Sequence, residues 1–384
     1  MTTAVIVDAI RTPSGRGKHG GALSHFHPVD LFGTVLRQLV VRNDLDPALV
    51  DDVIGGCLAQ VGEQAVNITR SAVLAAGFPE SVPATTVDRQ CGSSQQAVHF
   101  AAQGVIAGAY DIVIAGGVEL MSKYPINAAT LGEDNWGPLV RERYADGLVG
   151  QGISAELIAS RWGLDRETLD SYAARSHRLA ASADFSAELA DVGTGSADET
   201  IRPGTTVEGL GALKPAFHDE RMAARLPEID WRITAGNSSP LTDGSSAVLI
   251  MSEERAAQLG LTPRARFHSF AVVGSDPVEM LTGVIPATRR ILERSGLTID
   301  DIDTFEVNEA FASVPLAWQQ ELGADPDRLN PRGGAIALGH ALGSSGTRLL
   351  TTMLGTLEQT GGRFGLQTMC EGGGMANATL IERL

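Results

Sequence analysis

One arrangement of segments occurs twice along the chain and restricts the possible folds more than any other feature. In each copy a strand-like apolar segment is followed by a glycine-containing turn that opens a helix-like pattern, and another apolar segment then ends in glycines. Strands that alternate with helices form mostly parallel sheets covered by helices, so we interpret the chain as an α/β protein with an internal duplication. The first copy contains DDVIGG (51–56), CGSSQQAV (91–98) and DIVIAGG (111–117), and the second contains DIDTFEVNEA (301–310), GHALGSSGTRLL (339–350) and FGLQTMCEGGG (364–374).

The region between the two copies lacks this alternation of strands and helices. Polar, loop-like stretches surround an amphipathic helix predicted near Arg166–Ser182, and strand-then-helix order returns only at residues 242–260. We therefore interpret the middle of the chain as an insertion that divides the first copy. The predicted units are an N-terminal domain of residues 1–119 plus 243–264, an inserted loop domain of residues 120–242, and a C-terminal domain of residues 265–384.

The composition narrows the environment of the protein and its ligands. A chain of 384 residues is too long for a single hydrophobic core, so more than one structural unit is expected. Its formal net charge of −16 disfavours a nucleic-acid-binding surface, which needs a basic face. Three cysteines in so long a chain form no disulfide framework and favour a reducing compartment. No apolar run approaches the ~20 residues of a membrane span. We expect a cytoplasmic protein with neither a membrane nor a nucleic acid as partner.

Two local patterns resemble ligand motifs but do not fit them. Gly15, Gly17 and Gly20 form GxGxxG after a predicted strand, yet the helix that a dinucleotide fingerprint requires begins late, near Pro28. We therefore predict a glycine-rich surface loop there. His25 and the histidine two residues later have no suitably spaced carboxylate or cysteine, so we predict no metal site.

Cys91 is the first candidate for chemistry. A lone cysteine is most often a small buried hydrophobe. Cys91, however, lies between a short β-branched run and a Gly-Ser-Ser step into a helix. The first N–H groups of a helix stabilise a thiolate, so we expect this position to lower the pKa of the thiol. Gly92 leaves the backbone open to a ligand, and we predict that Cys91 is a nucleophile.

Three further segments place polar or reactive residues in comparable settings. His340 lies in a glycine-rich turn that opens a helix, where the backbone of a ligand-binding loop can approach a substrate. Cys370 ends a strand and precedes three glycines, whose N–H groups are free to point inward. Asn308 and Glu309 follow a strand and open a helix, where a polar pair can also be only a helix cap. A thiol, an imidazole and a second thiol suit acyl transfer through a covalent intermediate.

Taken together, five motifs resemble the thiolase family along essentially the whole chain. Their combination and order are far more specific than any one of them. The closest likeness is to actinobacterial thiolases of fatty-acid or steroid degradation. The family fold has two similar five-stranded α/β domains, layered α-β-α-β-α, with a loop domain over the acyl-CoA site. The motifs are VDRQCGSSQQA (87–97), GNSSPLTDGSSAV (236–248), NEAFA (308–312), GGAIALGHALGSSG (333–346) and CEGGG (370–374).

The resemblance implies a role for each candidate in the cleavage of 3-ketoacyl-CoA by CoA. Cys91 accepts the acyl group and His340 is the base that activates it. Cys370 exchanges a proton with the α-carbon of acetyl-CoA or with the CoA thiol. Asn308 holds a water that, with His340, stabilises the enolate oxygen. The backbone N–H groups of Cys91 and Gly372 form a second oxyanion hole.

The resemblance also implies the ligands and the contacts that hold them. Acyl-CoA and CoA are the partners, CoA is a substrate, and no metal or redox cofactor is implied. A homodimer or a homotetramer is expected. Ser239 matches the serine beside the pantetheine, and Arg202 falls near the position of an arginine that contacts adenine. Phe217 and Gln151 complete the expected substrate contacts.

Two positions depart from the family pattern. Ala341 replaces the usual proline after the histidine. Gly150-Gln151-Gly152 replaces the usual His-Met-Gly step beside the acyl pocket, which puts a preference for short acyl chains in doubt and suits larger or more polar acyl groups. Two alternative functions on the same fold are a decarboxylating ketosynthase and a non-catalytic acyl-CoA-binding protein. The second thiol disfavours the first, and the presence of all four catalytic candidates disfavours the other.

Overall fold

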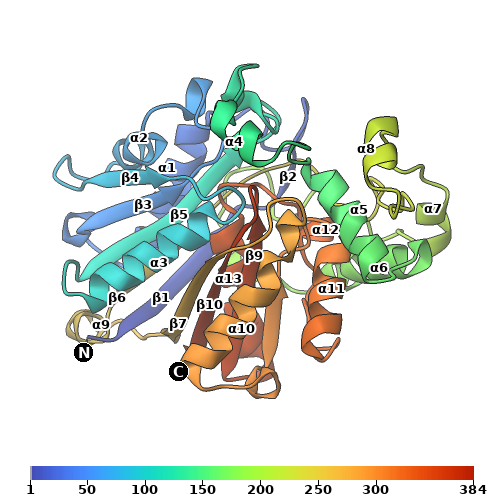
Figure 1. Cartoon of the computed structure of the whole chain (residues 1–384). Coiled ribbons are helices and arrows are strands. Elements are labelled where there is room, and N and C mark those ends of the chain that lie inside the picture. Colours follow the sequence, from blue (N-terminus) through green and yellow to red (C-terminus); the bar gives the residue numbers. More distant parts are fainter. Residues whose placement is uncertain (1) are drawn as a thin grey trace.

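The computed structural model describes residues 2–384 and shows one mixed sheet of ten strands in that part of the chain. The order of the strands is β4-β3-β5-β6-β1-β7-β10-β9-β8, and β2 pairs with β6 beside this path. In Figure 1 the first half runs from blue to teal, with β6 in yellow because it follows the insertion, and the second half is orange and red. The bounds are β1 Ala4–Arg11, β2 Gly15–Arg16, β3 Asp52–Gly56, β4 Ala84–Val87, β5 Ile112–Leu120, β6 Thr242–Ser252, β7 Ala265–Gly274, β8 Thr304–Val307, β9 Phe364–Glu371 and β10 Met375–Arg383.

Apart from the edge strand β4, the parallel and antiparallel pairings follow the same order from either end of the sheet, because each half repeats one topology. In the first half β3 is parallel to β4 and β5, and β6 is antiparallel to β5 and β1. In the second half β8 is parallel to β9, and β10 is antiparallel to β9 and β7. Within the sheet of residues 2–384, the halves join through two residue pairs between β1 and β7, Val5–Arg266 and Ile6–Ala265. This symmetry confirms the internal duplication.

The second copy lacks one full strand. In the position equivalent to β4 there is only an isolated bridge between Phe305 and Leu329. Pro326 and Pro331 flank that bridge, and a proline cannot donate a hydrogen bond to a strand ladder. Asn330, at φ 45°, also turns the backbone out of the extended region. The expectation of five strands per unit therefore holds for the first copy, while the second has four strands and this bridge.

The helices form three layers, and the two halves of the sheet lie between these layers. Helices α1 and α2 share an apolar core with the outer face of the first half. Helices α3 and α13 lie side by side between the halves and share a core with strands of both. Helices α10 and α11 pack on the outer face of the second half. This helix-sheet-helix-sheet-helix order confirms the expected fold class. The bounds are α1 Pro28–Arg42, α2 Ile68–Ala75, α3 Ser93–Ile106, α9 Glu253–Leu259, α10 Val284–Ser295, α11 Ser313–Leu322, α12 Ala335–Leu338 and α13 Ser345–Thr360.

The N-terminal ends of the two central helices meet. The backbone N–H of Thr347 donates to Ser94 Oγ at 3.1 Å. A Cβ atom on Gly346 would lie 2.1 Å from the backbone nitrogen of Gln95, so a larger residue would push the helices apart. Each helix N-terminus carries a partial positive charge. The turns that enter α3 and α13 therefore lie close together in a region that favours negative charge.

The inserted region contains five short to medium helices in the described chain; it runs from green to yellow in Figure 1, with α4 at the top of the view and α5 to α8 at the right. The helix predicted near Arg166–Ser182 forms with those bounds, and its N-cap Asp165 accepts from Thr168 N at 2.8 Å. Strand β6 follows the insertion and lies between β5 and β1. The predicted domain boundaries themselves stay a prediction. The helices are α4 Gly137–Arg143, α5 Gln151–Arg161, α6 Arg166–Ser182, α7 Val207–Gly211 and α8 Glu220–Arg225.

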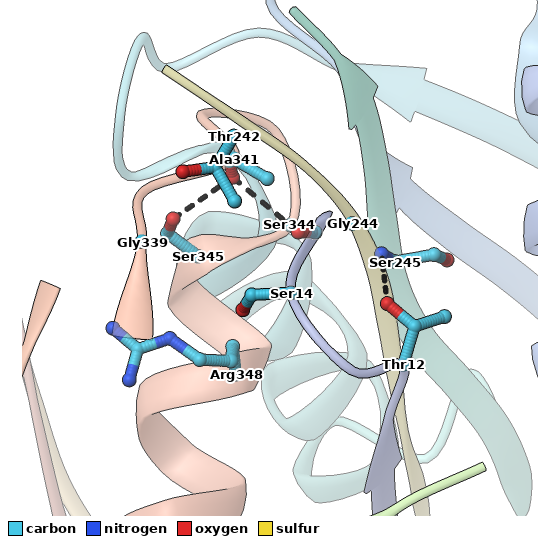
Figure 2. A pocket seen from close by; sticks show the side chains of 10 residues that line it. All are labelled: Thr12, Ser14, Thr242, Gly244, Ser245, Gly339, Ala341, Ser344, Ser345 and Arg348. Atoms are coloured by element: carbon cyan, nitrogen blue, oxygen red, sulfur yellow. Dashed lines mark hydrogen bonds between the residues drawn. The ribbon is translucent and has the colours of Figure 1, made fainter. Parts of the chain in front are cut away.

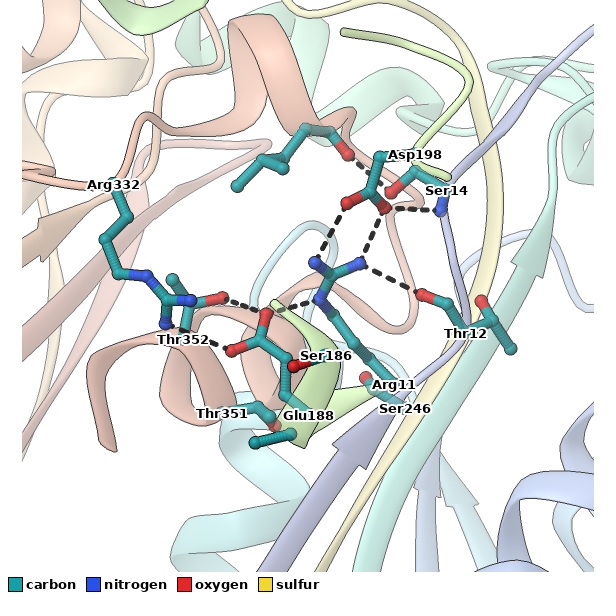
Figure 3. A network of polar contacts seen from close by, with 12 residues as sticks. Arg11, Thr12, Ser14, Ser186, Glu188, Asp198, Ser246, Arg332, Thr351 and Thr352 are labelled. Atoms are coloured by element: carbon teal, nitrogen blue, oxygen red, sulfur yellow. Dashed lines mark hydrogen bonds and ion pairs between the residues drawn. The ribbon is translucent and has the colours of Figure 1, made fainter. Parts of the chain in front are cut away.

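A buried ion cluster fastens the insertion to the sheet (Figure 3). Arg11, the last residue of β1, donates through Nε to Glu188 at 2.7 Å and through its two Nη atoms to Asp198 at 2.6 and 3.0 Å. Arg332 reaches the other oxygen of Glu188 at 3.3 Å. The side chain of Arg11 is 1% exposed, so these charges are held away from water.

Six 3-10 turns complete the secondary structure of the described chain, and none of its helices has the length and apolar character needed to cross a membrane. The turns are η1 Pro47–Leu49, η2 Gly62–Gln64, η3 Ala128–Thr130, η4 Ser186–Glu188, η5 Met280–Gly283 and η6 Ile299–Asp301.

Candidate active site

Cys91 lies in a strained turn between β4 and α3. Gln90, directly before it, has φ 50°, in the left-handed region that a residue with a side chain rarely adopts. Two side chains hold the turn in place: Asp88 accepts from Gln90 N at 2.7 Å, and Ser93 Oγ donates to Gln90 O at 2.6 Å. Helix α3 starts at Ser93, with Gly92 as its N-cap. The thiol is thus fixed at the entrance of the helix, as the sequence predicted.

The protonation of Cys91 differs from the sequence-based expectation. Its pKa is raised to about 12, chiefly because the thiol is buried and secondly because the carboxyl of Glu371 is close. Hydrogen bonds from Gln151 and from the backbone N–H of Cys91 itself act in the other direction but are weaker. The expectation of a lowered pKa is therefore wrong. Apolar neighbours of Cys91 are Leu58, Met121, Leu342, Leu349 and Met369.

His340 lies in the turn between α12 and α13, and its ring has one defined tautomer. Its Nδ1 lies 2.6 Å from Ser345 Oγ. The same hydroxyl donates its only proton to Ala341 O at 2.8 Å, and Figure 2 shows this second contact. Ser345 then accepts from the ring, so that Nδ1 carries the proton and the lone pair of Nε2 accepts from Asn308 Nδ2 at 3.3 Å. Burial, with the charge of Arg348, lowers the pKa of His340 to about 3. The ring is neutral and its Nε2 is a base.

The backbone of the His340 turn, which belongs to the second half of the chain, is held by two strands of the first half. His340 N donates to Thr242 Oγ1 at 2.9 Å, at the start of β6. Glu119, the penultimate residue of β5, accepts from Gly343 N at 2.9 Å through the oxygen that also accepts from Leu58 N at 2.9 Å. One carboxylate thus joins the loop after β3 to the turn that carries the histidine. The sequence contained Glu119 in a glycine-rich strand end, but nothing in the sequence alone indicated this role.

Asn308 connects the imidazole to the second thiol. It follows β8, and its backbone N donates to Thr368 O on β9 at 3.1 Å. Its Nδ2 lies 3.3 Å from His340 Nε2, and its side chain also hydrogen bonds Cys370. The buried Oδ1 of Asn308 has no hydrogen-bond partner among the described residues. A buried amide oxygen without a partner is costly, so this atom is available to a water or to a substrate group.

Cys370, near the end of β9, completes the cluster. Burial raises the pKa of its thiol, and the next largest cause is the charge on Cys91, which places the two sulfur atoms close together. Gly372 lies in the turn after β9 and touches the nucleophile turn: a Cβ on Gly372 would lie 2.9 Å from Gln90 Oε1. The four predicted catalytic residues and Gly372 therefore come together in one buried site.

Three of the four predicted substrate contacts lie near this cluster. Gln151, the first residue of α5, lies beside Cys91, and its side chain lowers the pKa of that thiol. Phe217 packs edge-to-face on Phe311 with ring centroids 5.7 Å apart and also fills the space beside Gly152. Ser239 donates from Oγ to Ala310 O at 3.1 Å, in the segment that follows Asn308.

Arg202 is the exception among the predicted contacts. Its side chain is exposed, and its backbone N donates to His177 Nδ1 on α6 at 3.2 Å. No contact links it to the cysteine-histidine cluster within residues 2–384, so its contact with adenine stays a prediction. In the same part of the chain, no group of three His, Cys, Asp or Glu side chains is arranged to hold a metal ion.

A very small cavity lies behind the His340 turn (Figure 2). Its volume of about 10 Å³ suits a single water. The cavity is polar, because Ser14, Thr242 and Ser345 line it together with Arg348. Both Nη atoms of the buried Arg348 lack partners among the described residues, which fits a hydrated pocket.

Comparison with known proteins agrees with this geometry. The chain is 50% identical to the steroid 3-ketoacyl-CoA thiolase FadA6 of Mycobacterium tuberculosis, over 100% of this chain and 95% of that protein. It is 45% identical to the 3-ketoacyl-CoA thiolase of Erwinia tasmaniensis over the full length of both. The crystal structure of the Bacillus anthracis acetyl-CoA acetyltransferase superposes with a TM-score of 0.87 at 36% identity, covering 100% of this chain and 99% of that one.

Family models match nearly the whole chain as well. The model of the thiolase N-terminal domain matches residues 4–254, and that of the thiolase C-terminal domain matches residues 261–383. The matches agree with the motifs, the duplicated fold and the cluster of two thiols, an imidazole and an amide. The chain therefore belongs to the thiolase family.

Proposed function

We propose that this protein is an acyltransferase that cleaves 3-ketoacyl-CoA with CoA, giving acetyl-CoA and a shortened acyl-CoA through an acyl-cysteine at Cys91. One observation carries the proposal: Cys91, Asn308, His340 and Cys370 converge in one buried cluster although they come from both copies of the fold. The relatives named 3-ketoacyl-CoA thiolases support the same reaction. A decarboxylating ketosynthase has no evident use for the second thiol.

In the first half-reaction His340 Nε2 takes the proton of Cys91, and the thiolate attacks the 3-keto carbon. A carbon–sulfur bond forms, and the bond between C2 and C3 breaks. The electron pair left on C2 takes the proton of Cys370, which releases acetyl-CoA. The N–H groups of Cys91 and Gly372 stabilise one oxyanion, and His340 with a water on Asn308 stabilises the enolate oxygen.

In the second half-reaction CoA becomes the nucleophile. The Cys370 thiolate takes the proton of the CoA thiol, and the new thiolate attacks the acyl-cysteine. The carbon–sulfur bond to Cys91 breaks as the bond to CoA forms. His340 then returns its proton to Cys91. Every proton taken in the first half is returned, so the cycle needs no redox cofactor and no metal.

The resting site is neutral, because the pKa of Cys91 is raised and that of His340 is lowered. Transfer of one proton between them creates an imidazolium and a thiolate in the same water-poor site, where opposite charges stabilise each other strongly. The converging N-terminal ends of α3 and α13 favour the thiolate further. The Cys91 thiolate therefore forms during the reaction and is not present in the resting site.

The acyl pocket suits a large or polar acyl group. Gln151 places an amide beside the nucleophile, where the family pattern has an apolar residue, and Gly150 and Gly152 keep the start of α5 narrow. The relative named a steroid thiolase supports bulky substrates. Cytoplasmic localisation and assembly as a homodimer or homotetramer are parts of the same proposal.

Acyl-enzyme trapping tests the reaction directly. The protein is mixed with a 3-ketoacyl-CoA without free CoA, digested and examined by mass spectrometry. Acyl mass is expected on the peptide that contains Cys91 and is lost in C91A. The matched control is C57A, which removes another buried cysteine outside the cluster and keeps the adduct. Acylation elsewhere, with none at Cys91, would contradict the mechanism. A thiolysis series from acetoacetyl-CoA to ring-bearing 3-ketoacyl-CoA tests the acyl preference.

A further inference from the structure

Glu371 is a buried acid beside the reacting thiols, and the proposed mechanism does not use it. It is the last residue of β9 and directly follows Cys370, and its side chain is fully shielded from solvent. Neither of its carboxyl oxygens has a hydrogen-bond partner among the described residues. A buried carboxylate without partners is very costly, whereas the protonated acid is much less so.

The carboxyl group lies directly under the nucleophile turn. A Cβ atom on Gly92 would be 2.0 Å from Glu371 Oε1, so only glycine leaves room for the acid there. The side chain of Asn377 approaches the same point from β10 and donates to Gly92 O at 3.1 Å. The amide oxygen of Asn377 is itself buried and unpartnered in the described chain, and it offers an acceptor on the same face of the sheet.

The charged groups around Glu371 do not neutralise it. Arg89, in the nucleophile turn, attracts the carboxylate but forms no ion pair with it among residues 2–384, and Arg89 Nε has no partner there. Asp88, in the same turn, repels it. The remaining titratable neighbours are the thiols of Cys91 and Cys370, and a negative Glu371 disfavours a thiolate at either one.

We propose that Glu371 is a tuning residue for the nucleophile: a carboxyl group kept neutral beneath Cys91, whose ionisation suppresses thiolate formation at both active-site thiols. The inference rests on the proposed role of Cys91. Glu371 and the Cys91 thiolate occupy the same positive end of α3, so the site tolerates one negative charge there and resists a second. The raised pKa of Glu371, about 9 because of burial, keeps the acid protonated at neutral pH.

The test is the rate of Cys91 alkylation by iodoacetamide between pH 6.5 and 10.5, read from the mass of the Cys91 peptide. In the wild type, the logarithm of the rate rises with pH, flattens near pH 9 as Glu371 ionises, and then rises again. In E371Q the side chain cannot ionise, so the flattening disappears. The two proteins react within about twofold of each other at pH 7, and E371Q reacts roughly three- to tenfold faster above pH 10, since one unit of pKa is a factor of ten.

The control is E358Q, which removes an exposed acid on α13 and keeps the wild-type profile. If the alkylation rates of wild type and E371Q depend on pH in the same way, or if E371Q is slower by the same factor at every pH, the tuning role is overturned. Glu371 would then have only a structural role. If E371Q does not fold, E371M provides a neutral side chain of similar length, and a wild-type profile without flattening overturns the inference on its own. Failure to label Cys91 in the wild type would instead refute the proposed nucleophile, and this inference with it.

Discussion

His340 Nδ1 and Ser345 Oγ lie 2.6 Å apart, and the serine gives its own proton to Ala341 O at 2.8 Å. The direction of these two hydrogen bonds fixes the histidine as the Nδ1–H tautomer. A serine at the first position of α13 thereby decides which ring nitrogen is the base.

Replacement of this serine is expected to slow catalysis without unfolding the protein. S345A removes the acceptor for Nδ1–H, so the ring can rotate or exchange its tautomer, and the loss of about 1–2 kcal/mol corresponds to roughly a 5- to 30-fold lower kcat. The measurement is thiolysis of acetoacetyl-CoA, with Tm as the check on folding. S344A is the control, because that hydroxyl contacts Ala341 O but not the ring. An unchanged kcat in S345A would refute the role.

The pH dependence of turnover follows from the shifted pKa values of Cys91 and His340. Burial places the pKa of Cys91 near 12 and that of His340 near 3, so the neutral pair is the dominant form throughout the range between them. His340 becomes protonated only when the pH falls through its lowered pKa. We expect kcat/KM to vary by less than about threefold from pH 6 to pH 8. An acidic limb with a pKa near 6.5 would show that the histidine is solvated in the working enzyme.

Gln151 is expected to assist the nucleophile. Its hydrogen bond lowers the pKa of Cys91 against the larger effect of burial, so Q151M should raise that pKa and slow alkylation of Cys91 by roughly three- to tenfold at pH 8. The same variant should improve the relative kcat/KM for unsubstituted short acyl chains over polar ones. Q103L, on the exposed face of α3, serves as the control. Equal alkylation rates in Q151M and the wild type would contradict the contact.

The Arg11 cluster is expected to contribute strongly to stability. D198A leaves Arg11 buried with one partner fewer, which should cost about 3–5 kcal/mol in urea unfolding. D325A breaks an exposed pair with Arg328 and should cost about 1 kcal/mol or less. A similar small loss in both would mean that the buried cluster is fully compensated by relaxation or water.

Acid should remove the same contribution from the wild type. Arg11 holds the pKa of Asp198 below its ordinary value despite burial. A depressed folded-state pKa stabilises the protein above the unfolded value of about 4, and the contribution is lost as the pH falls through the folded value. Below pH 4 the unfolding free energies of wild type and D198A should therefore converge, which urea titrations at several pH values can measure.

The sequence identified the catalytic candidates and the duplicated fold because both depend on local order. Strand, turn and helix follow one another within each copy. Cys91, His340 and Cys370 each lie in or beside a turn that contains glycine. The direction of the Cys91 pKa shift could not be predicted in this way. It depends on burial and on Glu371, which lies 280 positions further along the chain and reaches Cys91 only through the packing of β9 under α3.

The roles of Ser345 and Glu119 could not be predicted for the same reason, because they depend on contacts that form only when the chain folds. Ser345 was part of a quoted motif, but the proton that it gives to Ala341 is visible only once the helix has formed. Glu119 acts by joining two turns from different copies, which no local pattern encodes. Arg202 was placed by similarity over a loosely matching loop, and a loop of that kind has no periodicity to fix its position.

The meeting of α3 and α13 has an evolutionary reading. The turns that enter these helices are equivalent in the two copies, yet one presents Cys91 and the other presents His340. An ancestor made of one unit could bring such turns together only by self-association, with the same side chain on both sides. Fusion of the two units into one chain freed the two turns to diverge, so that an attacking group two residues before α3 now meets its base five residues before α13.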